Sequence, residues 1–126
     1  MSVTIKIQGT SYTPEVILDP GNNIYEISGH SMLIDAEVFY KKISDWLNDN
    51  HQSIGNDIEF NLKFAFLSTS TLKSIVRVFR ALEKINENNH NKITIIWHYE
   101  KEDNDMKLKG EEYRAIIKLP FKLKPY

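Results

Sequence analysis

The chain has 126 residues and a formal net charge of −1, with 41% hydrophobic and 26% charged residues. These values predict one globular domain over residues 1–126, with a core large enough to need no disulfides. The sequence contains no cysteine, which excludes disulfides, thiolate nucleophiles and cysteine-based metal sites. Because there is no basic excess, we expect no nucleic-acid partner.

The N-terminal segment, residues 1–7, lacks the basic region and the apolar run of a signal peptide. No stretch of the sequence approaches the ~18 consecutive apolar residues that a membrane span requires. We therefore expect a cytoplasmic protein without membrane insertion.

The first third of the chain predicts strands and one helix. Val3, Ile5 and Ile7 alternate with polar residues, which is typical of a strand. Two β-rich runs flank Pro20-Gly21-Asn22-Asn23, whose turn-forming residues predict a hairpin or a tight connection. Asp35 is a candidate N-cap for a helix whose apolar face follows helical spacing: Phe39, Ile43, Trp46 and Leu47.

The middle of the chain carries the strongest pattern. Strict alternation predicts a strand over 58–67, with apolar residues Ile58, Phe60, Leu62, Phe64 and Phe66. Helical spacing predicts a helix over 71–86, with an apolar face of Leu72, Ile75, Val76, Phe79, Leu82 and Ile85, closed by the asparagine-rich residues 86–91. A further strand is predicted over 93–99. Together these segments indicate a right-handed βαβ unit.

The C-terminal part predicts one more helix and one more strand. The acidic segment 100–105 favours the positive N-terminus of a helix that holds Met106, Tyr113 and Ile117. Leu119-Pro120 ends that helix, and Phe121 and Leu123 suit a short terminal strand. Strands alternating with helices predict the α/β class, a mixed β-sheet with helices packed against it.

Catalytic and metal-binding patterns are missing from the sequence. The four histidines, His30, His51, His90 and His98, have no metal-ligand spacing, and His98 is expected on the polar face of its strand. The five glycines are scattered singly, which excludes a Gly-rich phosphate loop. Without an evident pair of nucleophile and base, we expect no enzyme, no cofactor and no metal.

Four consecutive hydroxyl residues, Ser68-Thr69-Ser70-Thr71, join the strongest strand to the following helix. The plain interpretation is N-capping, because Ser and Thr oxygens accept hydrogen bonds from the free N–H groups of a helix start. The functional interpretation is phosphorylation, because the same N–H groups and the helix dipole favour an anion there.

Several short motifs follow one another along the chain: Thr13-Pro14-Glu15-Val16, Leu18-Asp19-Pro20, residues 24–31, Phe39-Tyr40, Asp45-Trp46-Leu47, residues 66–73, residues 97–100, Asp105-Met106, Gly110-Glu111 and Leu119-Pro120-Phe121. In their order and spacing these motifs resemble the SiaC family of bacterial regulatory phosphoproteins, which are similar to STAS-type anti-sigma-factor antagonists. The resemblance implies a STAS-like fold and a partner-switching function. It covers nearly the whole chain from Thr13.

In that family a threonine of the switch segment is phosphorylated by a dedicated Ser/Thr protein kinase and dephosphorylated by a PP2C-type phosphatase. The unphosphorylated form binds and activates a GGDEF-type diguanylate cyclase, which raises cyclic di-GMP and promotes biofilm formation. The resemblance assigns the phosphorylation to Thr69. Ser68 stands where the family usually has Asn, so Ser68 and Ser70 stay open as alternative phosphorylation sites.

The partner-binding surface is expected to contain the switch residues and three basic residues of the following helix: Ser68, Thr69, Ser70, Thr71, Lys73, Arg77 and Arg80. Lys73 lies four residues after Thr69, where it could pair with a phosphate. Two alternative functions stay open: the same switch acting on another client such as an anti-sigma kinase, and a small-molecule-binding domain. No heptad pattern is present, so we expect a monomer when free.

Overall fold

The computed structural model describes residues 4–89 and 91–126, so the expectations at Val3 and His90 fall outside the described residues. The described part forms one mixed sheet with helices, as the sequence predicts. The strands are β1 (Ile5–Ile7), β2 (Glu15–Asp19), β3 (Ile24–Ser31), β4 (Asp57–Leu67), β5 (Lys92–Tyr99) and β6 (Phe121–Pro125). The helices are α1 (Ala36–Asp49), the 3-10 helix η1 (His51–Ser53), α2 (Thr69–Asn89) and α3 (Asn104–Ile116).

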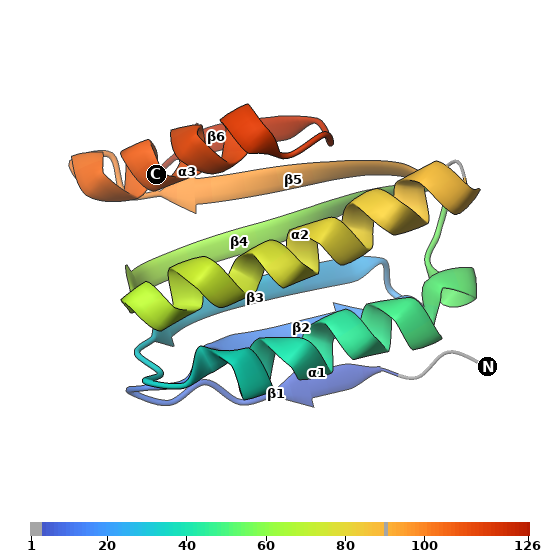
Figure 1. Cartoon of the computed structure of the whole chain (residues 1–126), viewed down its shortest axis with the longest axis horizontal. Coiled ribbons are helices and arrows are strands. Elements are labelled where there is room, and N and C mark those ends of the chain that lie inside the picture. Colours follow the sequence, from blue (N-terminus) through green and yellow to red (C-terminus); the bar gives the residue numbers. More distant parts are fainter. Residues whose placement is uncertain (1–3, 90) are drawn as a thin grey trace.

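The strands lie in the sheet in the same order as in the sequence, from β1 to β6. β1, β2 and β3 are antiparallel neighbours, and the predicted hairpin around Pro20 to Asn23 joins β2 to β3. From β3 to β6 every pairing is parallel, with one α-helix between successive strands. The predicted βαβ unit is therefore present as β4, α2 and β5 (Figure 1).

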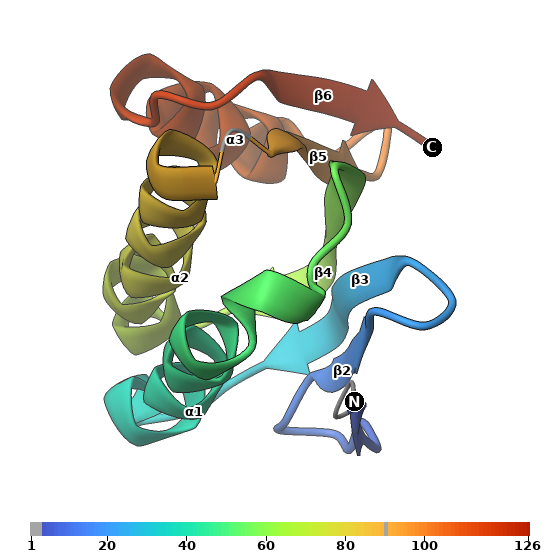
Figure 2. The ribbon, with the colours of Figure 1, turned by 90° about the vertical axis from the view of Figure 1, so that its right-hand side faces the viewer.

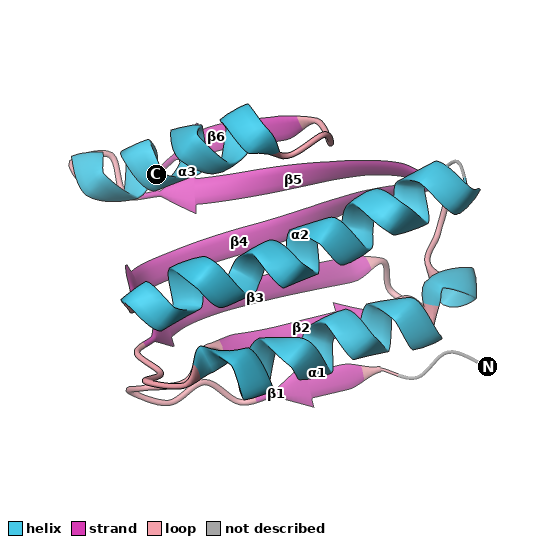
Figure 3. Cartoon of the chain, viewed as in Figure 1, coloured by secondary structure: helices cyan, strands magenta, loops and turns pink. Residues whose placement is uncertain are grey.

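The fold has two layers, because the described α-helices all lie on the same face of the sheet (Figures 2 and 3). The core fills the space between these layers with large side chains that are almost fully buried. Its largest members are Trp97, Tyr25, Tyr40, Phe60, Phe64 and Phe79. The opposite face of the sheet has no helix over it in the described part, so most of the alternate residues on that face are exposed or half-buried, with Ile96 as a buried exception.

The end of β4 departs from the alternation that the sequence predicts. Gly29 pairs with Phe64, but the next residue of β3, His30, pairs with Phe66, so Ala65 is an extra residue on β4. Gly29 has a φ of 98°, which a residue with a side chain rarely adopts. The expectation of a core position for Phe66 is wrong: the bulge turns Phe66 outward to 50% exposure and turns Leu67 inward.

Helix α2 starts two residues earlier and ends three residues later than the predicted range of 71–86. The early start has a clear cause. The Thr71 N–H donates to Ser68 Oγ at 3.1 Å, and the Leu72 N–H donates to the Ser68 backbone oxygen. Ser68 is therefore the N-cap of α2, and the first turn contains Thr69, Ser70 and Thr71.

Helix α3 approaches β5 and β6 unusually closely. Trp97 Nε1 donates to the backbone oxygen of Met106 at 3.0 Å, and Gly110 is buried one turn further on. The Asp103 side chain accepts from the Met106 N–H and caps α3, as the acidic segment predicts. Ile117 is buried but lies just beyond the helix in extended backbone, so its predicted helical position is wrong by one residue.

Glu83 ties α2 to the segment that leads into β6. It is buried to 8% exposure, pairs with Arg80 at 2.9 Å, and accepts a 2.7 Å hydrogen bond from the Lys118 N–H. Burial by itself raises the pKa of Glu83, but the Arg80 and Lys118 hydrogen bonds outweigh it and hold the pKa below its ordinary value of 4.5.

This lowered pKa predicts an acid-sensitive contribution to stability. The ionised carboxylate stabilises the fold fully above the unfolded-state pKa, and this contribution is lost as the pH falls through the lower folded-state pKa. Urea unfolding at about pH 6 and about pH 3 should therefore show a smaller drop in the free energy of unfolding on acidification (the acid loss) for Glu83→Gln than for the unchanged chain. Glu87→Gln, at an exposed position of the same helix, is the control and should behave like the unchanged chain. An equal acid loss in all three proteins would contradict the prediction.

Candidate functional site

The N-termini of α1 and α2 lie together beside the carboxyl ends of the central strands β3 and β4 (Figure 1). Two hydrogen bonds join the segments that precede these helices. Ser68 Oγ donates to the Leu33 backbone oxygen at 2.8 Å, and the Ala36 N–H donates to Ser70 Oγ at 2.9 Å. These two bonds bracket Thr69 on one side and Ile34 and Asp35 on the other, so the two segments run side by side.

Ser70 provides the cap of α1. Asp35 occupies the N-cap position of α1, but its side chain makes no capping hydrogen bond. The expectation that the Asp35 side chain caps this helix is therefore wrong. Ser70, from the first turn of α2, accepts the bond from the first N–H of α1 instead. The two helix starts are coupled through one hydroxyl, a contact between distant segments that no local pattern indicates.

We call residues 68–71 the switch segment, and Thr71 anchors this segment to the core. Its side chain is fully buried, and its Oγ1 donates to the Ser31 backbone oxygen at 3.1 Å. Thr71 Oγ1 also lies 2.7 Å from Ser31 Oγ and 2.9 Å from Ser68 Oγ, and Ser31 Oγ lies 2.8 Å from the Tyr40 hydroxyl. Burial raises the pKa of Tyr40, so its hydroxyl keeps its proton in this network. The buried hydroxyls fix the backbone on both sides of Thr69.

Thr69 differs from its three hydroxyl neighbours. It is exposed, and its hydroxyl has no hydrogen-bond partner in the part of the chain that the structure describes. Thr69 is the first residue of α2, where free N–H groups and the helix dipole favour an anion. Ser68 and Ser70 are half-buried and hydrogen-bonded, and Thr71 is inaccessible. Among these four side chains, Thr69 is the one best placed to accept a phosphate without loss of structure.

Exposed apolar side chains lie on the segments near the starts of α1 and α2, and the sequence analysis did not identify them. We call this set the apolar rim; its members are Tyr12 (67% exposed), Met32 (40%), Ile34 (97%), Val38 (61%) and Phe66 (50%). The Met32 N–H donates to the Tyr12 backbone oxygen, and His30, two residues before Met32, pairs with Phe66. Ile34 lies on the segment that runs beside Thr69, and Val38 lies in the first turn of α1. A cluster of exposed apolar side chains of this kind is typical of a protein-binding surface.

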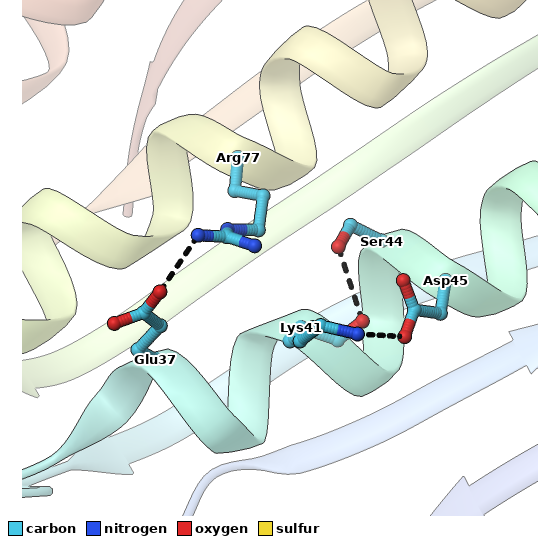
Figure 4. Close-up of polar contacts among 5 residues, drawn as sticks. All are labelled: Glu37, Lys41, Ser44, Asp45 and Arg77. Atoms are coloured by element: carbon cyan, nitrogen blue, oxygen red, sulfur yellow. Dashed lines mark hydrogen bonds and ion pairs between the residues drawn. The ribbon is translucent and has the colours of Figure 1, made fainter.

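The three basic residues predicted for the same surface lie at different distances along α2. Lys73 is exposed one turn after Thr69. Arg77, a further turn away, pairs with Glu37 of α1 at 2.8 Å (Figure 4). Arg80 pairs with the buried Glu83. Lys73 is therefore close to the switch segment, whereas Arg77 and Arg80 already hold structural contacts.

Other kinds of site have little support in the described residues. No group of three or more His, Asp and Glu residues at 4–89 and 91–126 could hold a metal ion. His98 faces away from the helices, as predicted, and its Nε2 lies 2.8 Å from Asn61 Oδ1. No helix in the described part is long and apolar enough to span a membrane.

Comparisons with known proteins agree on one family. The model of the SiaC family regulatory phosphoproteins matches residues 7–126. An uncharacterized protein of Pseudomonas aeruginosa, PA14_02130, is 21% identical over 122 residues, which covers 97% of this chain and 96% of that protein.

Solved structures show the same fold at low sequence identity. The crystal structure of apo-SiaC from Pseudomonas aeruginosa superposes with a TM-score of 0.83 at 21% identity, covering 98% of this chain and 99% of that one. A chain of the crystal structure of the diguanylate cyclase SiaD in complex with its activator SiaC gives 0.85 at 21% identity, covering 97% and 99%. The predicted mixed α/β fold is confirmed, and the chain belongs to the SiaC family of regulatory phosphoproteins.

Proposed function

We propose that this chain is a phosphorylation-controlled partner-switching protein whose unphosphorylated form binds and activates a diguanylate cyclase. It acts by binding and not by catalysis, as one regulatory domain. The observation that carries the proposal is the position of Thr69, exposed and without a hydroxyl partner in the described part, beside the Ile34 segment of the apolar rim. The activator role that is stated for SiaC in its complex with SiaD supports the choice of client.

The chemistry of the switch follows from what surrounds Thr69. A partner that covers the apolar rim removes Tyr12, Ile34 and Phe66 from water, which favours binding in proportion to the apolar area buried. A phosphate on Thr69 adds nearly two negative charges beside that surface. Docking would then require desolvation of the phosphate against apolar side chains, which is costly without a paired cation. The phosphorylated form should therefore release its partner.

The fold is expected to survive the modification. A phosphate on Thr69 meets the free N–H groups at the start of α2, where an anion stabilises the helix by about 0.3 to 1 kcal/mol. Lys73 is exposed one turn away and can approach the phosphate. The switch would thus change the charge of the binding surface and leave the core unchanged. A dedicated Ser/Thr kinase would add the phosphate, and a PP2C-type phosphatase would remove it.

Ser68 and Ser70 are poorer phosphorylation sites than Thr69. A phosphate on Ser68 would break its bond to Leu33, and a phosphate on Ser70 would displace the cap from Ala36. Phosphopeptide mapping of the protein from its native cells separates these possibilities. We expect phosphate at Thr69; phosphate at Ser68 or Ser70 would move the switch residue.

Binding to the native GGDEF-type cyclase tests the function. Thr69→Glu is expected to weaken binding by at least about tenfold, because each 1.4 kcal/mol of lost interaction is a factor of ten. Thr69→Ala should bind the cyclase, raise its activity like the unchanged chain, and not respond to the kinase. Gln52→Glu adds the same charge at an exposed position in η1 and serves as the matched control.

Two results would contradict the proposal. Equal cyclase affinity of the Thr69→Glu variant, the phosphorylated protein and the unchanged chain would remove the switch. In a pull-down with the Thr69→Ala variant as bait, the second such result is the recovery of no GGDEF protein and of another client, for example an anti-sigma kinase. That result would keep the switch and replace the client. The remaining contacts predicted for the partner, at Lys73, Arg77 and Arg80, can be mapped with the same assay.

A further inference from the structure

A row of basic side chains crosses the face of the sheet that carries no helix. Lys63 of β4 pairs in register with His98 of β5, and His98 pairs with Lys124 of β6. The sequence neighbours of each point into the helix-covered core: Leu62 and Phe64, Trp97 and Tyr99, and Leu123. Because side chains alternate along a strand, the three basic residues share the opposite face, which is turned away from the helices in Figure 2.

The row places one lysine on each side of His98. Neighbouring strands are about 4.8 Å apart, so Lys63 and Lys124 are separated by two strand spacings and do not lie directly opposite each other. No ion pair within residues 4–89 and 91–126 neutralises Lys63, Lys122 or Lys124. Lys122, two residues before Lys124, adds a further cation on the same face of β6. The Lys63 ammonium lies over the Tyr126 ring, 4.5 Å from its centroid, which holds the lysine in place without cancelling its charge.

Acidic residues share this face with part of the row. Glu26 pairs with Asn61, two residues before Lys63, and Glu59 and Asp57 lie four and six residues before Lys63 on β4. Strands β5 and β6 hold no acidic residue. The positive charge is therefore concentrated toward β6, at Lys122 and Lys124, although the chain as a whole has a formal charge of −1.

His98 sits in the middle of the row in a fixed orientation. Asn61 Oδ1 can only accept, so the 2.8 Å contact makes His98 Nε2 the donor and leaves Nδ1 as the second polar atom of the ring. Burial lowers the pKa of His98, and Lys124 and Lys63 lower it further, against the opposite effect of Glu59. An anion that neutralises the two lysines would remove their part of this lowering and so raise the pKa of His98.

The surface beside the row is hollowed. A depression of about 300 Å³ is lined by Glu59, Asn61, Ile96, Lys122, Leu123 and Lys124. A second one of about 630 Å³ includes Asn61, Lys63 and His98 in its wall together with Glu26, Asp57 and Glu59, so the depression beside Lys122 and Lys124 favours an anion more. The backbones of β4 and β6 at Lys63 and Lys124 lie two strand spacings, about 10 Å, apart. This separation is longer than a single carboxylate and suits two linked phosphates.

We propose that Lys63, His98, Lys122 and Lys124 form a binding site for a phosphate-bearing anion, in particular a diphosphate group. The lysines bind the phosphate oxygens through charge-assisted hydrogen bonds, and Asn61 fixes the orientation of His98. The site is on the sheet layer and shares no residue with the apolar rim or with Thr69, although Phe66 follows Lys63 by three residues on β4. It does not depend on the proposed switch, and it can be tested in protein that carries no phosphate on Thr69.

The test is a titration of the full chain with inorganic pyrophosphate, followed by NMR of the His98 ring and the Ile96 amide. The unchanged chain should show saturable shifts at both residues and a rise of the His98 pKa. Lys63→Gln and Lys124→Gln should each weaken binding by about tenfold, the scale of one hydrogen bond between charged groups. Lys42→Gln, at an exposed position of α1 in the other layer, should leave binding unchanged.

A parallel arm identifies the source of the phosphate. Sedimentation with phosphatidylcholine vesicles that contain phosphatidylglycerol tests a lipid headgroup as the ligand. Vesicle binding that is lost in Lys63→Gln and Lys124→Gln would support the site with a lipid as the source, even if pyrophosphate binds weakly. The proposal is overturned if neither probe binds with a Kd below about 10 mM, or if both lysine variants keep full binding. Thermal unfolding of the variants checks that they fold.

Discussion

Gly110→Ala is expected to lower the free energy of unfolding by about 3 kcal/mol, the upper range for overpacking a core. A Cβ atom at Gly110 would lie 2.5 Å from Trp97 Cδ1 and 2.6 Å from Leu123 Cδ2, closer than any ordinary contact. Trp97 is fully buried, and its Nε1 donates a hydrogen bond to the backbone oxygen of Met106, which lies in the same helix as Gly110. The indole therefore cannot move aside freely. Helix α3 would have to shift away from β5 and β6.

Two opposing effects act in this variant, and the steric clash is the larger one. Alanine stabilises a helix interior over glycine by up to about 1 kcal/mol, so the same substitution at an exposed helical glycine would raise the stability. Urea unfolding with two-state analysis measures the difference. Gly55→Ala is the matched control, because its Cβ would meet nothing closer than 3.9 Å and should change stability by less than about 1 kcal/mol. An unchanged or higher stability of Gly110→Ala would refute the close approach of α3.

Thr71→Val is expected to lower the free energy of unfolding by about 2 kcal/mol, although valine has nearly the same shape as threonine. The substitution removes the hydroxyl that donates to the Ser31 backbone oxygen and contacts Ser31 Oγ and Ser68 Oγ. Each of these groups is left with fewer partners in a site from which water is excluded, because Thr71 is fully buried.

The comparison with Thr71→Ser separates the hydroxyl from the methyl group. Serine keeps the hydrogen bonds and loses one buried methyl, which costs about 1 kcal/mol. We expect Thr71→Ser to be more stable than Thr71→Val in urea unfolding. The reverse order would mean that apolar packing, and not the hydroxyl network, holds the start of α2. Because the network flanks Thr69, Thr71→Val should also speed hydrogen exchange of the amides in the first turn of α2.

The phosphorylation switch and the anion site make separate demands on the molecule. The proposed switch would use exposed side chains at the carboxyl ends of β3 and β4, where the two helix starts meet. The proposed anion site would use charges on the uncovered face of β4, β5 and β6. Substitutions at Thr69 should leave pyrophosphate binding unchanged, and Lys63→Gln should leave the response of cyclase binding to Thr69 phosphorylation unchanged.

The sequence by itself determined the elements, since their patterns are local. The alternation from Ile58 to Phe64 and the helical spacing from Leu72 to Ile85 both predicted segments that the structure contains. Pro20 to Asn23 indicated the turn between β2 and β3 for the same reason. The Ser68 to Thr71 run predicted a helix start, because four hydroxyls that can cap a helix are visible in the sequence, and its phosphorylation stays a prediction.

Tertiary structure alone decided what each of those hydroxyls does. Ser70 caps α1, Thr71 is buried against Ser31, and Thr69 is exposed, because α1 and α2 begin side by side at one edge of the sheet. The bulge opposite Gly29 turned Phe66 outward, against the alternation that placed it in the core. The apolar rim and the row of Lys63, His98 and Lys124 likewise combine residues far apart in the chain. Their proximity depends on strand register and helix packing, which are long-range interactions that local periodicity does not encode.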